Sequence, residues 1–128
     1  MSFQQFPPLK GENPGVYFTS EDVDFKLEKE EATGEWLKKT IEQEGKQLLL
    51  LNFIFCSDKY LHRLNVEYLQ HDTFTDVITF PYAELPVVEG DIFISIERVK
   101  ENAEKFKVPF LKELQRVMVH GVLHLCGY

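Results

Sequence analysis

The segment Gln47–Cys56 constrains the fold of this chain more than any other part of its sequence. It reads QLLLLNFIFC, and its apolar run is interrupted only by Asn52. A strand that is apolar on both faces has to be covered on both faces, so we expect it in the interior of a sheet. The run is much shorter than the roughly 18–20 apolar residues that span a bilayer. We therefore expect a central strand and no membrane partner.

The flanking segments have the patterns of further strands and helices. β-Branched or alternating runs predict three more strands, at Val16–Thr19, Asp76–Phe80 and Asp91–Ile96, with a loop over 83–90 before the last one. Apolar residues at helical spacing predict helices over 30–44, from a Ser57 cap through Tyr68, over 97–107, and from Pro109 to about Cys126. The whole chain, 1–128, is thus expected to be one α/β or α+β domain. It would have about four strands, about four helices, and an irregular arm over 1–15.

Composition and charge limit the classes of function. The 128 residues carry a net charge of −7, which argues against a protein that coats nucleic acid through many phosphate contacts. Residues 97–116 are an exception, with six basic and four acidic side chains. This segment is either an ordinary solvated helix face or a patch that steers phosphates. Two cysteines and the lack of a basic, then apolar, leader favour the cytoplasm.

The two histidines near the end of the sequence are its most informative feature. His120 and His124 are four residues apart on a predicted helix, so both imidazoles lie on one face and can hold one metal ion, such as zinc. No charged residue follows Arg116, so we expect both histidines to be buried and to need a partner. Such pairs also arise by chance on helices. Zinc peptidases place a glutamate after the first histidine, whereas this chain has Gly121.

Three stretches resemble one known family. The segment HGVLHLCGY, residues 120–128, is similar to the pattern H-G-x-L-H-L-x-G-Y-D-H of the YbeY-type rRNA maturation factors. Residues 64–81 resemble the family's L-N-x-x-Y-R-x-x-D-x-P-T-D-V-L-S-F-P, and Gly90–Ile92 its G-D-I strand start. The three stretches occur in the family's order, and the resemblance covers about residues 16–128.

The resemblance implies a fold, an activity and a set of site residues. The fold would be a mixed sheet covered by helices, with one zinc ion bound by three histidines. The activity would be hydrolysis of single-stranded RNA, in 16S rRNA 3′-end maturation and ribosome quality control. His120 and His124 would be zinc ligands, Asp91 would be tied to a small-subunit ribosomal-protein partner, and Thr75 and Asp76 would line the cleft.

Two departures from the family pattern affect the expected site. The third histidine of the pattern would fall two residues beyond Tyr128, so we expect incomplete zinc binding by these 128 residues. Cys126 is a poor substitute unless the helix ends before it, because it is roughly 200° around the helix from His124. The arginine of the pattern is Leu69 here, and His71 or Arg116 would have to replace its phosphate contact.

The residues alone leave several roles open. Thr75 and Asp76 are either turn residues before a strand or cleft residues, with Asp76 positioning water or a histidine. Asp91 is either a turn residue or a partner contact. We interpret the chain as a metal-dependent endoribonuclease with Asp76 and Arg116 as catalytic candidates. The alternatives are a metallopeptidase-like hydrolase and a non-catalytic ribosome-associated binding module.

Overall fold

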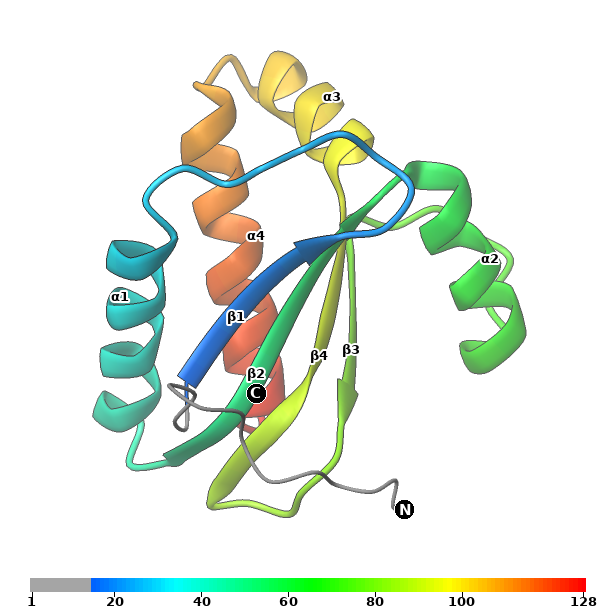
Figure 1. Cartoon of the computed structure of the whole chain (residues 1–128). Helices are drawn as coiled ribbons and strands as arrows, with labels where there is room; N and C mark the ends of the chain where they lie inside the picture. The colour runs from blue at the N-terminus through cyan, green and yellow to red at the C-terminus, as the bar shows by residue number, and fades with distance from the viewer. Residues whose placement is uncertain (1–14) are drawn as a thin grey trace.

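The computed structural model describes residues 15–128, which form a four-stranded sheet with helices packed around it (Figure 1). The elements in chain order are β1 (Gly15–Ser20), α1 (Glu30–Gln43), β2 (Gln47–Cys56), α2 (Asp58–Leu69), β3 (Val77–Pro81), β4 (Val87–Ser95), α3 (Ile96–Phe106) and α4 (Phe110–Leu125). The expected α+β class is confirmed. The arm expected over 1–15 lies outside the described residues, apart from Gly15, which begins β1.

The sheet is mixed, as expected, and has the strand order β1-β2-β4-β3. β1 and β4 both pair with β2 in parallel, whereas β3 pairs with β4 in antiparallel fashion. β2 is therefore an inner strand, with Leu51 and Phe53 buried on one face and Ile54 and Cys56 buried on the other. The apolar character of Gln47–Cys56 on both faces has its cause in this inner position.

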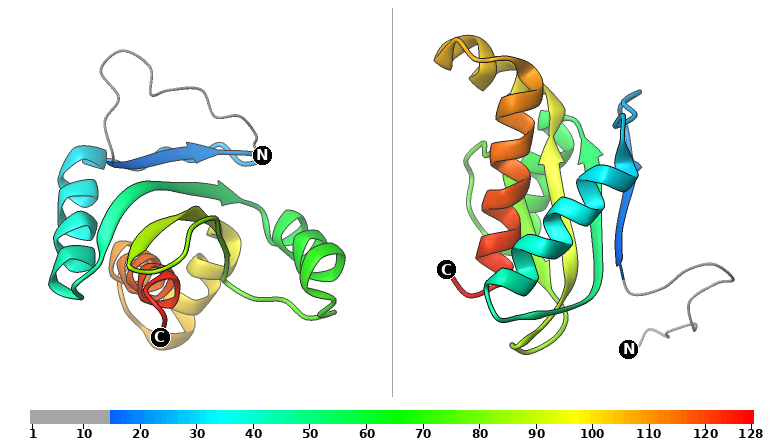
Figure 2. Two further views of the ribbon diagram at one scale, coloured as in Figure 1. Left: turned by 90° about the horizontal axis from the view of Figure 1, so that it is seen from below. Right: turned by 90° about the vertical axis from the view of Figure 1, so that its left-hand side faces the viewer.

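The two faces of the sheet are covered unequally. The main core lies between one face and the helices α1, α3 and α4, and includes Leu37, Phe53, Ile92, Val99 and Met118. A smaller cluster of Cys56, Leu61 and Ile78 lies on the other face, where α2 packs. Figure 2 shows α1 and α4 on the same side of the curved sheet, with α2 at its far end. Within residues 15–128, no helix is both long enough and apolar enough to cross a membrane.

Serine residues begin the two helices that follow β2 and β4. The Ser57 side chain accepts a hydrogen bond from the backbone N–H of Tyr60 at 3.0 Å, so its expected role as the cap of α2 is confirmed. Ser95 caps α3 in the same way, through the N–H of Arg98 at 3.0 Å. Because β2 and β4 are parallel neighbours, α2 and α3 start side by side at the same edge of the sheet.

The fourth strand was predicted with the wrong start. β4 begins at Val87 rather than Asp91, so Gly90 lies within the strand and not in a loop. Its pairing with β2 starts at Val87, opposite Gln47, and this pairing overrides the turn preference of glycine. A Cβ atom at Gly90 would lie 2.5 Å from the carbonyl oxygen of Phe80 in β3. Glycine is thus required here by the close approach of a neighbouring strand.

The Gly90→Ala variant tests this packing constraint. We expect it to lower the free energy of unfolding by roughly 1–3 kcal/mol, because the Phe80 carbonyl belongs to the paired backbone and cannot move aside. Gly34→Ala is the matched control, since its added Cβ would make an ordinary 3.6 Å contact with Val16. Alanine within α1 should instead stabilise by roughly 0.5–1 kcal/mol. Urea denaturation measures both, and equal stability of the two variants would contradict the explanation.

Candidate active site

The helix α4 presents His120 and His124 on its solvent-facing side. Their rings lie one turn apart, with centroids separated by 6.3 Å and planes inclined by 19°. Both side chains are exposed, so the expectation that they are buried was wrong. The apolar residues around them face the sheet instead, and Gly121 lies so close to β4 that a Cβ would be 3.0 Å from Ile92 Cγ2. The pair is therefore held on a helix that is fixed tightly to the sheet.

The two histidines open into a cleft of about 400 Å³ between α4, β3 and the loop that joins α2 to β3. Its polar lining consists of Asn65, His71, Thr73, Thr75, Asp76, Thr79, His120 and His124. Among these lining residues, Asp76 is the carboxylate. The structure thus brings four of the residues expected at the site, Thr75, Asp76, His120 and His124, into one cleft.

Thr79 of β3 is the direct polar neighbour of the histidine pair. Its Oγ1 lies 3.3 Å from Nδ1 of His124. When Nδ1 carries the proton it donates to Thr79, and Nε2 then has the lone pair that a metal ion requires. Thr79 corresponds to the serine in the quoted family stretch, but sequence reasoning gave it no role. The contact between Thr79 and His124 depends on the packing of α4 beside β3, which the sequence does not show.

The Asp76 wall of the cleft is fixed through the backbone as well as the side chain. The carbonyl oxygen of Asp76 accepts a hydrogen bond from the N–H of Ser95 at 3.0 Å, which ties it to the end of β4. The Asp76 carboxylate lies 3.7 Å from Nη2 of Arg116 on α4. The two expected catalytic candidates therefore lie next to each other across the cleft rim.

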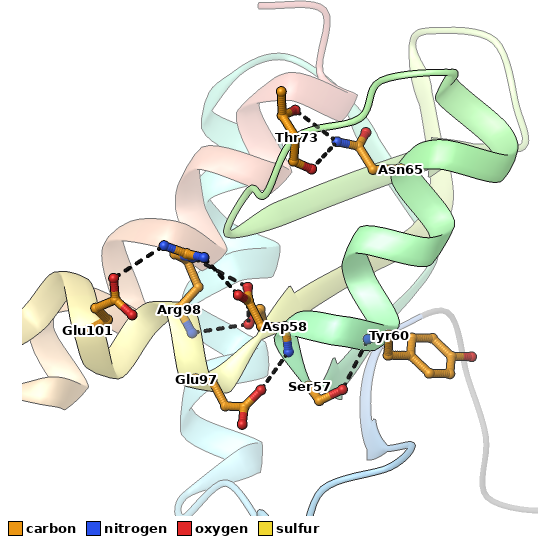
Figure 3. Close-up of polar contacts among 9 residues, drawn as sticks. Ser57, Asp58, Tyr60, Asn65, Thr73, Glu97, Arg98 and Glu101 are labelled. Carbon is orange, nitrogen blue, oxygen red and sulfur yellow. Dashed lines mark hydrogen bonds and ion pairs between the residues drawn. The ribbon is translucent and has the colours of Figure 1, made fainter.

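A buried asparagine holds the loop that leads into this wall. Asn65 on α2 is 4% exposed, and its side-chain amide donates to the carbonyl oxygen of Thr73 at 2.9 Å and to Thr73 Oγ1 at 3.2 Å (Figure 3). Because a buried amide that loses its partners is costly, these bonds specify one loop conformation. The signal in the sequence was an asparagine on the apolar side of an amphipathic helix, at Leu64-Asn65.

Arg98, in the basic segment 97–116, is paired with a carboxylate of the protein and is not free to bind a ligand. Its guanidinium donates to both carboxylate oxygens of Asp58, from Nε at 3.3 Å and from Nη2 at 2.7 Å (Figure 3). This pair joins the starts of α2 and α3, and the guanidinium also lies 5.4 Å from the Phe74 ring centroid. Arg98 thus stabilises the loop between α2 and β3 through its contact with Phe74. Because its charge is already paired with Asp58, not every basic side chain of 97–116 is available to bind phosphates.

Arg116 has a different partner and remains half exposed. Glu113, which is 2% exposed, accepts from Nε of Arg116 at 3.0 Å and from Nη2 at 2.7 Å. These hydrogen bonds raise the pKa of Arg116, so it stays charged at any ordinary pH. Sequence reasoning missed Glu113, because an acidic residue on a helix is normally solvated. Its spacing of three residues from Arg116 was the available signal.

The histidine pair fits two of the three protein ligands of a catalytic zinc site. Its imidazoles are exposed, one turn apart and directed into a polar cleft. Within residues 15–128, no group of three or more His, Cys, Asp or Glu side chains is placed to hold a metal ion. Cys126 directly follows the end of α4, but it is 3% exposed within the main core and does not line the cleft. The described residues therefore supply a two-histidine site.

Asp91 lies away from this cleft. Its neighbours in β4, Gly90 and Ile92, face α4, so its own side chain is on the opposite face of the sheet. It accepts hydrogen bonds from Asn52 Nδ2 at 3.2 Å and from the Tyr82 hydroxyl at 2.8 Å. Partial burial of Tyr82 and the hydrogen bond that its hydroxyl donates to Asp91 raise the pKa of Tyr82 to about 12. The interpretation of Asp91 as a turn residue was wrong, and any partner contact there is separate from the histidines.

Comparison with known proteins gives one consistent family. The family model for Endoribonuclease YbeY matches residues 16–128. An Endoribonuclease YbeY of Amoebophilus asiaticus is 54% identical over 114 residues, which cover 88% of this chain and 78% of that protein. The Flavobacterium johnsoniae protein of the same name is 50% identical over 107 residues, covering 84% of this chain and 77% of that protein.

A solved structure agrees with the sequence comparisons. The solution structure of a Thermotoga maritima protein superposes with a TM-score of 0.58 at 33% sequence identity. The match covers 88% of this chain and 73% of the other. Taken together with the histidine cleft, these matches establish that the chain belongs to the Endoribonuclease YbeY family.

Proposed function

We propose that this chain is a zinc-dependent endoribonuclease that cleaves single-stranded RNA. The observation that carries the proposal is the pair His120 and His124, exposed one turn apart in a cleft that also contains Asp76. Relatives named Endoribonuclease YbeY support RNA as the substrate. We further propose that the RNA is the 3′ end of 16S rRNA, and that the protein acts with the ribosome or a small-subunit ribosomal protein, in the cytoplasm, including ribosome quality control.

Five residues in or beside the cleft have a chemical role in this proposal. His120 and His124 would hold the zinc ion, which supplies Lewis acidity toward a phosphodiester when it is bound. Thr79 orients His124 through Nδ1. Asp76 accepts a hydrogen bond from the attacking water and orients it toward phosphorus, and Arg116 neutralises charge on the phosphate oxygens. Leu69, at the position of the family's arginine, lines the cleft and supplies no charge.

The structure gives less support to the alternatives. A peptidase would need a carboxylate after the first histidine, whereas this position is Gly121, where a Cβ would already lie 3.0 Å from Ile92 Cγ2. A binding module without activity would not require Asp76 and the histidines in one cleft. Cleavage of peptides with RNA left intact would favour the first alternative. Ribosome binding that persists without RNA cleavage would favour the second.

Substitution of the cleft residues should reduce RNA cleavage in a graded way. We expect His120→Ala and His124→Ala each to slow cleavage of a single-stranded oligonucleotide by on the order of 100-fold or more, because a metal ligand is lost. Thr79→Val, which keeps shape but removes the hydroxyl, should slow it roughly 10-fold. Lys105→Ala is the control, since Lys105 is exposed on α3 and does not line the cleft. Cleavage rates with zinc supplied in excess measure the series, and equal rates for all variants would refute the assignment.

Asp76 should affect the rate of cleavage and not the binding of RNA. We expect Asp76→Asn to lower the single-turnover rate on the order of 100-fold, because an amide orients water without accepting its proton. RNA affinity should stay equal or increase, since a negative charge beside the phosphates is removed. Single-turnover kinetics over a range of protein concentrations separates the two quantities. A weaker affinity with an unchanged rate would show that Asp76 has a structural role instead.

The zinc content of the 128-residue chain should be low. Two histidines among the described residues are one ligand short of a catalytic zinc site, so we expect less than one zinc ion per chain after dialysis. His120→Ala should reduce the content further, whereas His62→Ala should leave it unchanged. Elemental analysis provides the measurement. One tightly held zinc ion per chain would mean that this chain supplies a further ligand.

A further inference from the structure

A row of basic side chains continues from the histidine cleft along α4. Its members are four residues apart and all exposed, and we call them the α4 ridge: Lys112, Arg116, His120 and His124. The residues between them, such as Leu114, Val117 and Val122, are buried. Residues four apart on a helix form a continuous row that rises about 6 Å per step, inclined to the helix axis. The ridge therefore leads from the cleft toward the start of α4.

The orientation of Arg116 in this row is fixed by a buried carboxylate beneath it. The carboxylate of Glu113 is buried and holds the Nε and Nη2 edge of the guanidinium, and neither contact uses Nη1. An anion arriving from solvent thus meets the guanidinium before the buried carboxylate. The 3.7 Å contact with Asp76 places Arg116 at the rim of the cleft. The pair satisfies the buried Glu113 carboxylate and at the same time fixes the orientation of Arg116.

Lys112 continues the row one turn earlier. It is exposed, and within residues 15–128 it takes part in no ion pair. Arg98, in the same basic segment, is by contrast held by Asp58 at the back of the cleft loop. Within the basic segment 97–116, the structure thus places Arg98 in a bracing contact and aligns Lys112 and Arg116 with the histidines.

The negative charge of the rest of the chain makes this row of basic side chains a favoured place for a polyanion to bind. With a net charge of −7, most of the surface repels a polyanion, so a nucleic-acid strand is accepted only where cations are gathered. A row of basic groups at regular intervals suits a backbone that carries one phosphate per nucleotide. The ridge supplies such a row, and one end of it is the proposed reaction site.

We infer that the backbone of single-stranded RNA follows the α4 ridge, with Arg116 and Lys112 holding phosphates on one side of the bond cleaved at His120 and His124. The inference rests on the proposed function, because it assigns the path of that function's substrate. It also explains how the site can retain RNA although Leu69 on α2 replaces the arginine of the family pattern. The positive charge that binds phosphate then comes from Arg116 and Lys112 on α4.

RNA affinity as a function of salt concentration tests this path. A fluorescent single-stranded oligonucleotide is titrated with protein in the presence of a chelator, which prevents cleavage. We expect Lys112→Gln to raise the Kd roughly threefold to tenfold and to reduce the slope of log K against log salt by about 0.7, the value for one phosphate contact. Lys105→Gln is the control, because Lys105 is exposed on α3 outside the ridge and its substitution changes the net charge equally.

The Arg116 position requires a paired variant. Arg116→Gln alone leaves the buried Glu113 without its partner and is expected to impair folding. The double variant Glu113→Gln with Arg116→Gln removes both charges and leaves the net charge unchanged, so a Kd increase of roughly threefold to tenfold reports the local cation. Circular dichroism confirms that each variant is folded, and Lys112→Gln provides a test that does not depend on Glu113.

The outcomes separate the path from the function. Wild-type affinity in Lys112→Gln and in the double variant would overturn the ridge, even if the wild-type chain cleaves RNA. A loss in Lys105→Gln as large as that in Lys112→Gln would also overturn it, because binding would then depend on the whole basic segment. No binding and no cleavage of RNA by the unaltered chain would overturn the proposed function together with this inference.

Discussion

The close packing of α4 against β3 and β4 is the constraint on which the site depends. Gly121 on the helix and Gly90 on the sheet each occupy a position where a Cβ would meet a neighbouring element. Val117, Met118 and Val122 fill the interface around them, within the main core. Because this face of the helix is committed to the sheet, His120 and His124 are left on the face that opens into the cleft.

The opposite wall of the cleft depends on polar contacts. Asn65 holds Thr73, the N–H of Ser95 holds the Asp76 carbonyl, and Arg98 joins Asp58 behind the loop. Polar groups in these surroundings are satisfied by specific partners, so the wall has one defined geometry. A rigid apolar contact on one side and a directional polar network on the other together set the relative positions of the histidines and Asp76.

Most of the fold followed from local patterns in the sequence. The apolar segment Gln47–Cys56 predicted an inner strand, and Ser57 predicted the start of α2; both are confirmed. The start of β4 was predicted wrongly, because Gly90 is a turn signal in local terms. Its place inside a strand results from the pairing of β4 with β2, and the Phe80 carbonyl of β3 approaches too closely at this position for any side chain. Such a contact between strands is not encoded in neighbouring residues.

For the site, the sequence by itself determined which residues were available, and the fold decided how they were combined. The spacing of His120 and His124 placed them on one helix face, but their exposure depended on which side of α4 met the sheet. Thr79 contacts His124 because β3 lies beside α4. Glu113 binds Arg116 because tertiary packing buries Glu113 beneath that side chain. Two arginines of one basic segment likewise differ by their partners, Asp58 and Glu113. Helical periodicity is a local property of the chain, whereas burial and pairing are properties of surfaces that only tertiary packing brings together.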